Sequence, residues 1–220
     1  MRKEVVSAGK LKSLQCFLDG LKWDGKHRLE TWMEDYLCAE SPPIDHGNNW
    51  LVAAVKRTFE PGCDVGAPLM VLRGRQGIGK TSALKLLATF GDVGMEQIYC
   101  TDLIGFLQIH ESSAVAAMQD NLIVILDRLE KITKKNTDDF REWLCLGTDT
   151  VLRKYENVPE IYPRQFVFAA TVNSDKILRW ATSKNSEVIV VNVKDQIDLE
   201  KIKRDKLQLW AEAVYLYNNS

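Results

Sequence analysis

The chain has 220 residues, 45% of them hydrophobic, which is enough for a buried core in one domain with a smaller appended subdomain. Lys and Arg number 29 against 30 Asp and Glu, and this net charge of -1 excludes a general attraction to nucleic acid, so any such contact needs a local basic surface. The longest apolar run is too short to span a bilayer, and five scattered cysteines without a C-x-x-C pair predict reduced thiols, so we expect a cytoplasmic protein.

The first forty residues predict a helix, a turn and a second helix. Apolar residues recur at helical spacing over residues 11–18 and again over 32–37, and Asp24-Gly25 between them is a strong turn signal. Trp23 and Trp32 flank this turn. Their size favours packing against a neighbouring element, and the alternative is a surface for a partner or a nucleotide.

A further helix is predicted over residues 50–59, and it stops before Pro61-Gly62. A glycine-rich motif follows this break. We therefore predict a small N-terminal helical subdomain over residues 1–62 and a P-loop ATPase domain over residues 63–220.

Residues 74–81 read Gly-Arg-Gln-Gly-Ile-Gly-Lys-Thr and fit the phosphate-binding pattern G-x-x-x-x-G-K-[ST] at every fixed position. Residues 69–72 predict a buried strand before the loop, and residues 82–88 predict a helix after it. In that context the glycines let backbone N–H groups point at phosphate oxygens, and the helix adds the positive end of its dipole. The alternative is a glycine-rich turn with a chance lysine.

This loop predicts a site for ATP and Mg²⁺. Lys80 would reach the β- and γ-phosphates, and the Thr81 hydroxyl would bind the Mg²⁺ ion that bridges them. The predicted nucleotide-binding residues are Gly74, Gln76, Gly77, Ile78, Gly79, Lys80, Thr81 and Ser82.

A second apolar strand, over residues 121–126, ends at Asp127, where a P-loop ATPase needs an acid. We expect Asp127 to hold Mg²⁺ through water and Glu130 to orient the attacking water. Glu130 has an alternative role, because with Lys131 it could simply start a solvated helix.

Residues 149–164 predict two short strands around a turn. Within them Arg153, Lys154 and Tyr155 place positive charge beside an aromatic ring, a combination that can bind single-stranded DNA. The alternative is an ordinary hairpin with a solvated basic pair.

A third apolar strand, over residues 166–172, ends at Asn173. Ligands gather at the carboxyl ends of open parallel sheets, so we expect the Asn173 amide beside the loop, where it would position the hydrolytic water. An amphipathic pattern over residues 198–217 predicts a long helix or helix pair that closes the nucleotide pocket from the far side.

Six short sequence blocks are distributed along nearly the whole chain: Trp23-Asp24-Gly25-Lys26, Glu60-Pro61-Gly62-Cys63, Gln76-Gly77-Ile78-Gly79-Lys80, Pro163-Arg164-Gln165, Ala170-Thr171-Val172-Asn173 and Leu209-Trp210-Ala211-Glu212-Ala213. Together they resemble the virulence-associated protein E family. Its members look like superfamily 3 helicases, AAA+-type ATPases of phages, plasmids and mobile islands that are often joined to a primase. The resemblance implies an α/β P-loop NTPase fold with a parallel sheet flanked by helices, a ring-shaped homo-oligomer, and a hairpin that grips single-stranded DNA.

The chain departs from this family after Leu178-Arg179, where members usually carry a Gly-Asn-Arg-Arg run whose arginines resemble fingers that complete a neighbour's active site. Ser186 and Glu187 stand where the arginine pair would fall. We therefore expect slow hydrolysis unless Lys184 or Arg179 substitutes. The sequence also holds no primase stretch, and we expect a core without the family's usual extensions.

Two functions from different classes fit these residues. The first is a helicase-like ATPase for DNA replication of a phage, plasmid or mobile element, which binds ATP and Mg²⁺, forms a ring and acts on single-stranded DNA. The second is a nucleotide-binding interaction protein that docks a primase or another replication partner with little or no hydrolysis, and the missing arginines favour it. A third function, a small-molecule kinase, is disfavoured by Asn173.

Overall fold

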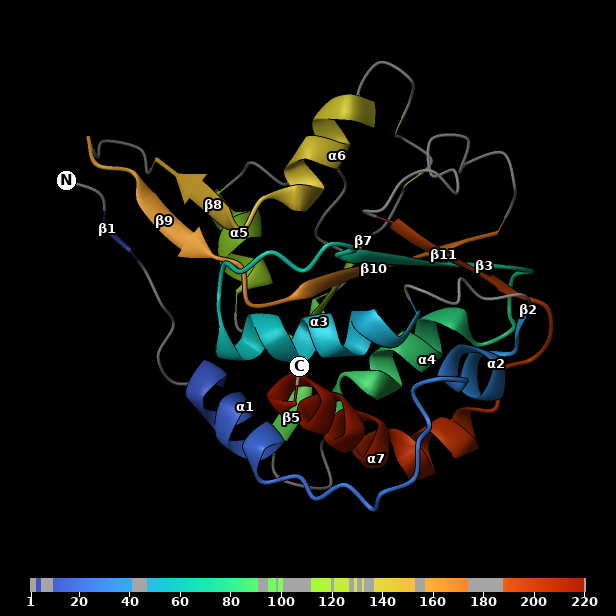
Figure 1. The fold of residues 1–220 in the computed structure, drawn as a ribbon. Coiled ribbons are helices and arrows are strands. Elements are labelled where there is room, and N and C mark those ends of the chain that lie inside the picture. The colour runs from blue at the N-terminus through green and yellow to red at the C-terminus, as the bar shows by residue number, and fades with distance from the viewer. Residues whose placement is uncertain are drawn as a thin grey trace.

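The computed structural model describes residues 3–4, 10–40, 47–90, 95–97, 99–100, 112–119, 121–126, 129, 132, 137–152, 157–173 and 188–219. Within these ranges the chain forms a mixed α/β fold with a mostly parallel central sheet and helices on both faces (Figure 1). This architecture confirms the predicted fold class at the level of a parallel sheet flanked by helices.

The central sheet has six strands among the described residues, in the order β2, β11, β3, β10, β7, β6. All neighbours pair in parallel except β2, which runs antiparallel to β11 at one edge. Buried apolar residues fill β3, β7 and β10, as expected for parallel strands that are covered on both faces. The strands are β2 Ala39–Glu40, β3 Leu69–Arg73, β6 Tyr99–Cys100, β7 Ile123–Leu126, β10 Val167–Val172 and β11 Val188–Val193.

One face of the sheet is covered by two helix layers, which Figure 1 shows below the strands. Helices α3 (Gly47–Phe59) and α4 (Lys80–Leu87) contact β10, and α7 (Leu199–Asn218) packs against both of them. Helices α1 (Lys10–Asp19) and α2 (Trp32–Leu37) also contact α3 and α7. A continuous hydrophobic core fills the space between these helices and the sheet.

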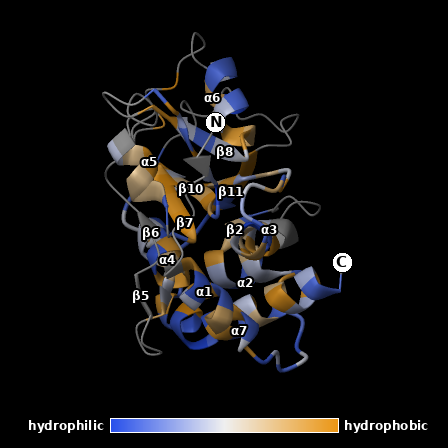
Figure 2. Ribbon diagram, turned by 90° about the vertical axis from the view of Figure 1, so that its left-hand side faces the viewer, coloured by the Kyte–Doolittle hydropathy of each residue, from blue (hydrophilic) through white to orange (hydrophobic). Residues whose placement is uncertain are grey.

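The opposite face carries a second hydrophobic core. Helices α5 (Ser112–Met118) and α6 (Thr137–Cys145) cover it, and the antiparallel hairpin of β8 (Thr148–Val151) and β9 (Glu160–Pro163) extends from it. The short strand β1 (Lys3–Glu4) pairs in parallel with β9, and β4 (Thr89–Phe90) pairs with β5 (Met95–Gln97) away from the main sheet. Figure 2 shows β7 and β10 in hydrophobic colours between the two helical layers.

The segment between α1 and α2 packs along α7 and is hydrogen-bonded to it. The buried carboxylate of Glu212 accepts hydrogen bonds from the backbone amides of Arg28 (2.7 Å) and Leu29 (3.0 Å). The Trp23 ring packs on Tyr215 with centroids 4.4 Å apart, and Trp32 is buried. Both tryptophans therefore pack within the chain, as their size favours.

The predicted helices, the three apolar strands and the hairpin are confirmed in type and approximate place. The C-terminal pattern forms one helix, α7, which packs against α3 and α4, and its closing of the nucleotide pocket stays a prediction. The boundary at residue 62 stays a prediction. Described residues before it, such as Leu18 and Trp32, share the larger core with α7 and the sheet.

Candidate phosphate-binding site

The glycine-rich loop follows β3 directly and is held against the neighbouring strands. The Gly74 amide donates to the carbonyl oxygen of Val172, 3.2 Å away at the end of β10. A Cβ atom on Gly74 would lie only 2.5 Å from the carbonyl oxygen of Val193, so no larger residue fits without moving the backbone. Gly77 and Gly79 have φ angles of 84° and 89°, a left-handed conformation that favours glycine.

This turn brings Lys80 back over its own loop. Its ammonium group donates hydrogen bonds to the carbonyl oxygens of Gly74 (2.8 Å) and Arg75 (2.6 Å) and to Oδ1 of Asn173 (3.1 Å). Because an ammonium group can only donate, the oxygen of the Asn173 amide must face Lys80 and its NH₂ group must face elsewhere. The predicted meeting of Lys80 and Asn173 thus occurs in the fold.

The charge of Lys80 is not neutralised by any carboxylate that the structure describes. Only 5% of the residue is exposed, and its three acceptors are two carbonyls and an amide, all of them uncharged. Burial lowers the pKa of Lys80 below its usual value, because the charged form loses hydration. An anion beside the ammonium group would offset that loss.

The loop, the start of α4 and the end of β10 line an open cavity of about 360 Å³, within the usual size range of small-molecule sites. Lys80 lies at the first position of α4, where the opening amides of a helix have no partner in the helix and the dipole favours an anion. The cavity is lined by Gln76, Gly77, Gly79, Lys80, Thr81, Ser82, Thr171 and Asn173.

Two of the eight predicted loop residues, Gly74 and Ile78, do not line this cavity. The Gly74 carbonyl holds Lys80, while the Ile78 side chain is buried and its carbonyl accepts a hydrogen bond from the Ile197 amide at 3.1 Å. Both residues therefore hold the loop in place on the side away from the cavity. Gly79 is the point where Ile197 and the first residue of α7 come near the loop.

Thr171 lines the cavity although sequence reasoning did not select it. It lies near the end of β10, two residues before Asn173, which directly follows the strand, and residues two apart in extended backbone point to the same face. That spacing was the available signal.

Several predicted functional residues lie outside the described residues. They are the acids Asp127 and Glu130, the hairpin residues Arg153, Lys154 and Tyr155, and the segment 174–187 with Arg179, Lys184, Ser186 and Glu187. The strand before the first acid is described: β7 ends at Leu126, in register with Ala170 of β10.

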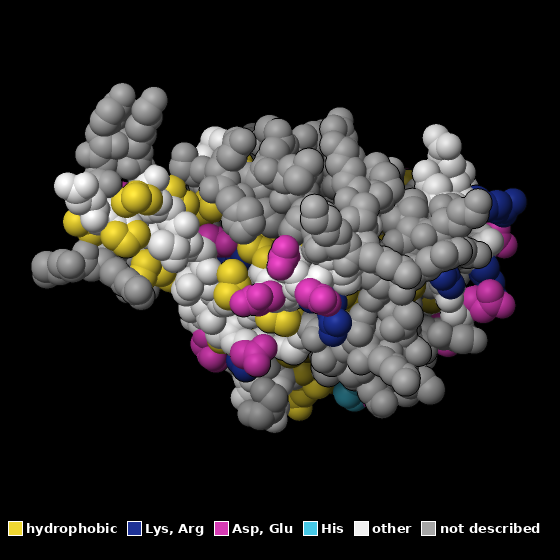
Figure 3. Space-filling model, turned by 90° about the horizontal axis from the view of Figure 1, so that it is seen from above, with side chains coloured by type: hydrophobic (Ala, Val, Ile, Leu, Met, Phe, Trp, Pro, Cys, Tyr) yellow, Lys and Arg dark blue, Asp and Glu magenta, His cyan; other side chains and the backbone are white. Residues whose placement is uncertain are grey.

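Outside the cavity, the surface seen from above has two notable regions. Apolar side chains gather at the end that holds the hairpin, where Leu152 is 63% and Val158 is 41% exposed (Figure 3). The exposed residues Asp138, Asp139 and Glu142 make α6 acidic. That acidic helix would repel a nucleic-acid backbone.

A model of the virulence-associated protein E-like domain matches residues 18–220. The chain belongs to this family. Among solved structures, it is similar to the apo C-terminal region of NrS-1, with a TM-score of 0.49, 12% identity and coverage of 96% of this chain and 46% of that one. It is also similar to two structures of the JCV helicase. The structure without inhibitor matches with a TM-score of 0.40 and 12% identity, and the inhibitor-bound structure with a TM-score of 0.40 and 11% identity. Each match covers 94% of this chain and 59% of that one.

The chain thus spans about half the length of these structural relatives. No curated protein matches it significantly. Among the helices that the structure describes, none combines the length and hydropathy that a membrane span requires.

Proposed function

We propose that the chain is an ATP-binding module that uses the loop at residues 74–81 to hold the phosphates. One observation carries this proposal: the buried ammonium group of Lys80 stands over a cavity with only neutral partners among the described residues. A buried cation without a counter-ion is costly, and a polyphosphate would supply the missing negative charge.

The loop's residues divide the work of binding. Lys80 would contact the phosphate oxygens while its loop carbonyls keep the ammonium group in place. The amides that open α4 would donate to the same anion. The NH₂ group of Asn173, turned away from Lys80, would donate to a phosphate oxygen or to the attacking water.

The donor set also fits Mg²⁺ carried in by a nucleotide. The structure describes no cluster of three or more His, Cys, Asp or Glu side chains, so the site lacks an all-protein metal cage in that part of the chain. Mg²⁺ seldom uses such cages and prefers phosphates, water and one or two protein oxygens, which the Thr81 hydroxyl and Asp127 would provide. The bound ion would neutralise charge on the phosphates.

Membership of the virulence-associated protein E-like family supports the further proposal of a helicase-like ATPase in the replication of a mobile element. In this proposal Glu130 orients the attacking water, the chain forms a homo-oligomeric ring, and Arg153, Lys154 and Tyr155 contact single-stranded DNA. Arg153→Ala with Lys154→Ala should weaken binding of a labelled oligonucleotide and flatten its salt dependence.

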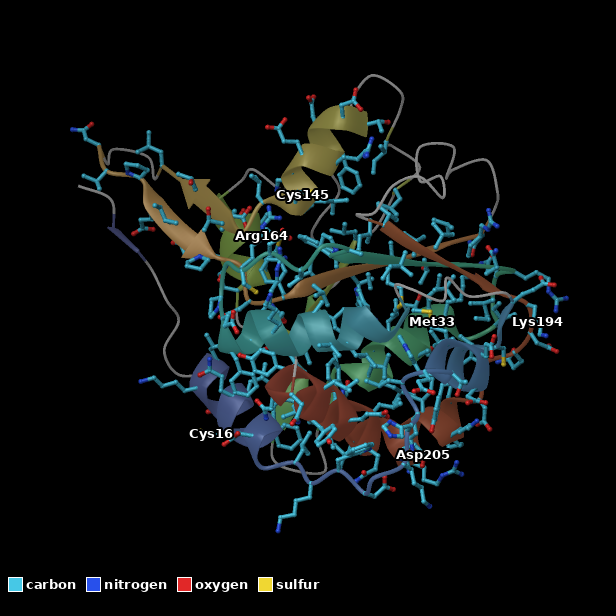
Figure 4. The ribbon with its side chains drawn as sticks, in the orientation of Figure 1. Cys16, Met33, Cys145, Arg164, Lys194 and Asp205 are labelled. Carbon is cyan, nitrogen blue, oxygen red and sulfur yellow. The ribbon has the colours of Figure 1, made fainter. Side chains whose placement is uncertain are left out.

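ATP binding is tested by calorimetric titration of the wild type and of Lys80→Ala. We expect Lys80→Ala to lose at least about 100-fold in affinity, because a charge-assisted contact to phosphate disappears. The matched control is Lys194→Ala, an exposed lysine at the turn between β11 and α7 (Figure 4). Equal affinity of a folded Lys80→Ala protein would rule out this loop as the phosphate site.

The docking-protein function remains the second candidate, because Ser186 and Glu187 replace the family's arginine pair. It predicts nucleotide binding with feeble hydrolysis, and Ser186→Arg with Glu187→Arg would then leave turnover unchanged. A lost arginine finger instead predicts that these two substitutions raise kcat with little effect on affinity. A steady-state ATPase assay with and without single-stranded DNA separates the two.

A further inference from the structure

Two threonine hydroxyl groups meet in the cavity. Thr81 stands in the first turn of α4 and Thr171 near the end of β10, and their Oγ1 atoms are 3.3 Å apart. The two residues are 90 positions apart in sequence, so the fold creates the pair. The register of β10 against β3, with Thr171 opposite Leu72, fixes Thr171 next to the strand from which the loop departs.

The chemistry of a hydroxyl ligand makes this contact meaningful. A hydroxyl group has one proton and two lone pairs, and a cation binds a lone pair. When Thr81 ligates a cation through Oγ1, its proton must point away from that cation and needs an acceptor. Oγ1 of Thr171 is within hydrogen-bond distance and, like Thr81, lines the cavity.

We propose that Thr171 is a positioning residue for the divalent cation: it accepts the Thr81 proton and thereby turns the Thr81 lone pairs toward Mg²⁺ bound with the nucleotide. This inference rests on the proposed ATP site. Lys80 and the α4 amides are the groups that we assign to the phosphates. Among the contacts that the structure describes, the Thr171 side chain touches neither of them, and the inference gives it a function of its own.

Two substitutions separate the hydroxyl from the rest of the side chain. Thr171→Val keeps the β-branched shape that suits a half-buried strand position but removes the acceptor. Thr171→Ser keeps the hydroxyl and removes only a methyl group. Thermal unfolding of each variant checks that β10 still folds.

The test measures the affinity of each protein for ATP in saturating Mg²⁺ and in EDTA, together with the Mg²⁺ concentration that gives half of the gain. For Thr171→Val we expect about a fivefold loss of affinity in Mg²⁺ and a similar rise in the half-saturating Mg²⁺ concentration, with affinity in EDTA within about twofold of wild type. Thr171→Ser should behave like the wild type.

Each other outcome overturns the inference. A Thr171→Val protein with wild-type Mg²⁺ dependence would show that Thr81 needs no proton acceptor at residue 171. An equal loss in Mg²⁺ and in EDTA would place the hydroxyl on the phosphates or the loop rather than on the cation. If the wild type binds no ATP in either condition, the proposed function fails as well, which distinguishes that failure from the other two.

Discussion

Two of the buried cations that the structure describes, Lys80 and Arg164, have opposite surroundings. Arg164 is fully buried at the base of the hairpin, where it makes two hydrogen bonds to the Asp149 carboxylate (2.7 and 2.8 Å). It also lies over the ring of Trp143, 4.5 Å from its centroid, and donates to the Trp143 carbonyl oxygen. Figure 4 places Arg164 between α6 and the hairpin, at the end of the sheet opposite Lys194.

The partners of the two cations distinguish a structural role from a ligand-binding one. Arg164 has a counter-ion, an aromatic face and backbone acceptors, so its charge is satisfied within the fold. Lys80 has neutral acceptors only, among the residues described, and it faces a cavity. This contrast supports the proposal that Lys80 binds a ligand, whereas Arg164 holds the hairpin on the domain.

A second buried guanidinium makes Asp149 more important. Arg57 on α3 donates to the carbonyl oxygens of Cys63 and Phe166, and burial, with a smaller contribution from the nearby charge of Arg164, lowers its pKa to about 10. Asp149 is thus the counter-ion for a site where two cations come close.

We expect the largest effect on stability from removing the counter-ion of Arg164. Asp149→Asn leaves Arg164 buried without its carboxylate, and we expect a loss of about 3 to 5 kcal/mol in the free energy of unfolding. Denaturant unfolding measures it. Asp24→Asn, which removes the exposed partner of Arg28, is the control and should change stability little. Unchanged stability of Asp149→Asn would mean that the cluster does not hold the hairpin.

Gly74→Ala tests whether the loop around Lys80 is built as closely as the structure shows. The new Cβ would lie 2.5 Å from the Val193 carbonyl oxygen, so the loop must shift, at a cost of about 2 kcal/mol in stability. Gly20→Ala is the control, because Gly20, like Gly74, has no positive φ, while its Cβ would lie 3.3 Å from the nearest atom, the Cys16 carbonyl oxygen. If both variants lose the same stability, the close approach to Val193 does not explain the glycine at residue 74.

Asn173→Asp would give Lys80 a carboxylate counter-ion, as Arg164 has in Asp149. The new carboxylate would pair with Lys80, only 3.1 Å from the present amide oxygen, and would repel phosphate. We expect about a tenfold loss of ATP affinity with no loss of stability. Asn173→Ala, which adds no charge, should lose less. Tighter ATP binding by Asn173→Asp would contradict the role given to the charge.

The smallest effect is a pH dependence. Since burial lowers the pKa of Lys80 from 10.5, the ammonium group begins to lose its proton at a lower pH than a free lysine. Phosphate binding needs the protonated form, so ATP affinity should be constant near neutral pH and fall about threefold toward pH 10. Lys80→Arg, which stays charged, should not show this fall. The same decline in both proteins would assign it to another group.

These comparisons show where sequence reasoning succeeds. The loop at residues 74–81 is recognisable because its pattern is local, and Asn173 could be placed beside Lys80 because the carboxyl ends of parallel strands share one edge. Confirmed strands at β3, β7 and β10 follow from short, continuously apolar runs.

The remaining features depend on contacts between distant residues. Nothing in the sequence marks Asp149 as the partner of Arg164, or Arg57 as a donor to Phe166, since buried polar groups look like any others until the fold assembles them. The packing of α7 against α3 and α4 could not be predicted for a related reason: an amphipathic pattern shows that a helix has an apolar face but not which element covers that face.

The most direct test of the central claim, that Lys80 is a cation held for a phosphate chain, is a calorimetric titration of the wild type with ATP, ADP and AMP in EDTA. The account predicts that ATP and ADP bind and that AMP, which lacks the β-phosphate expected at Lys80, binds at least about 100-fold more weakly than ADP. Equal affinities for all three nucleotides would contradict it, because the base and ribose and not the phosphates would then hold the ligand.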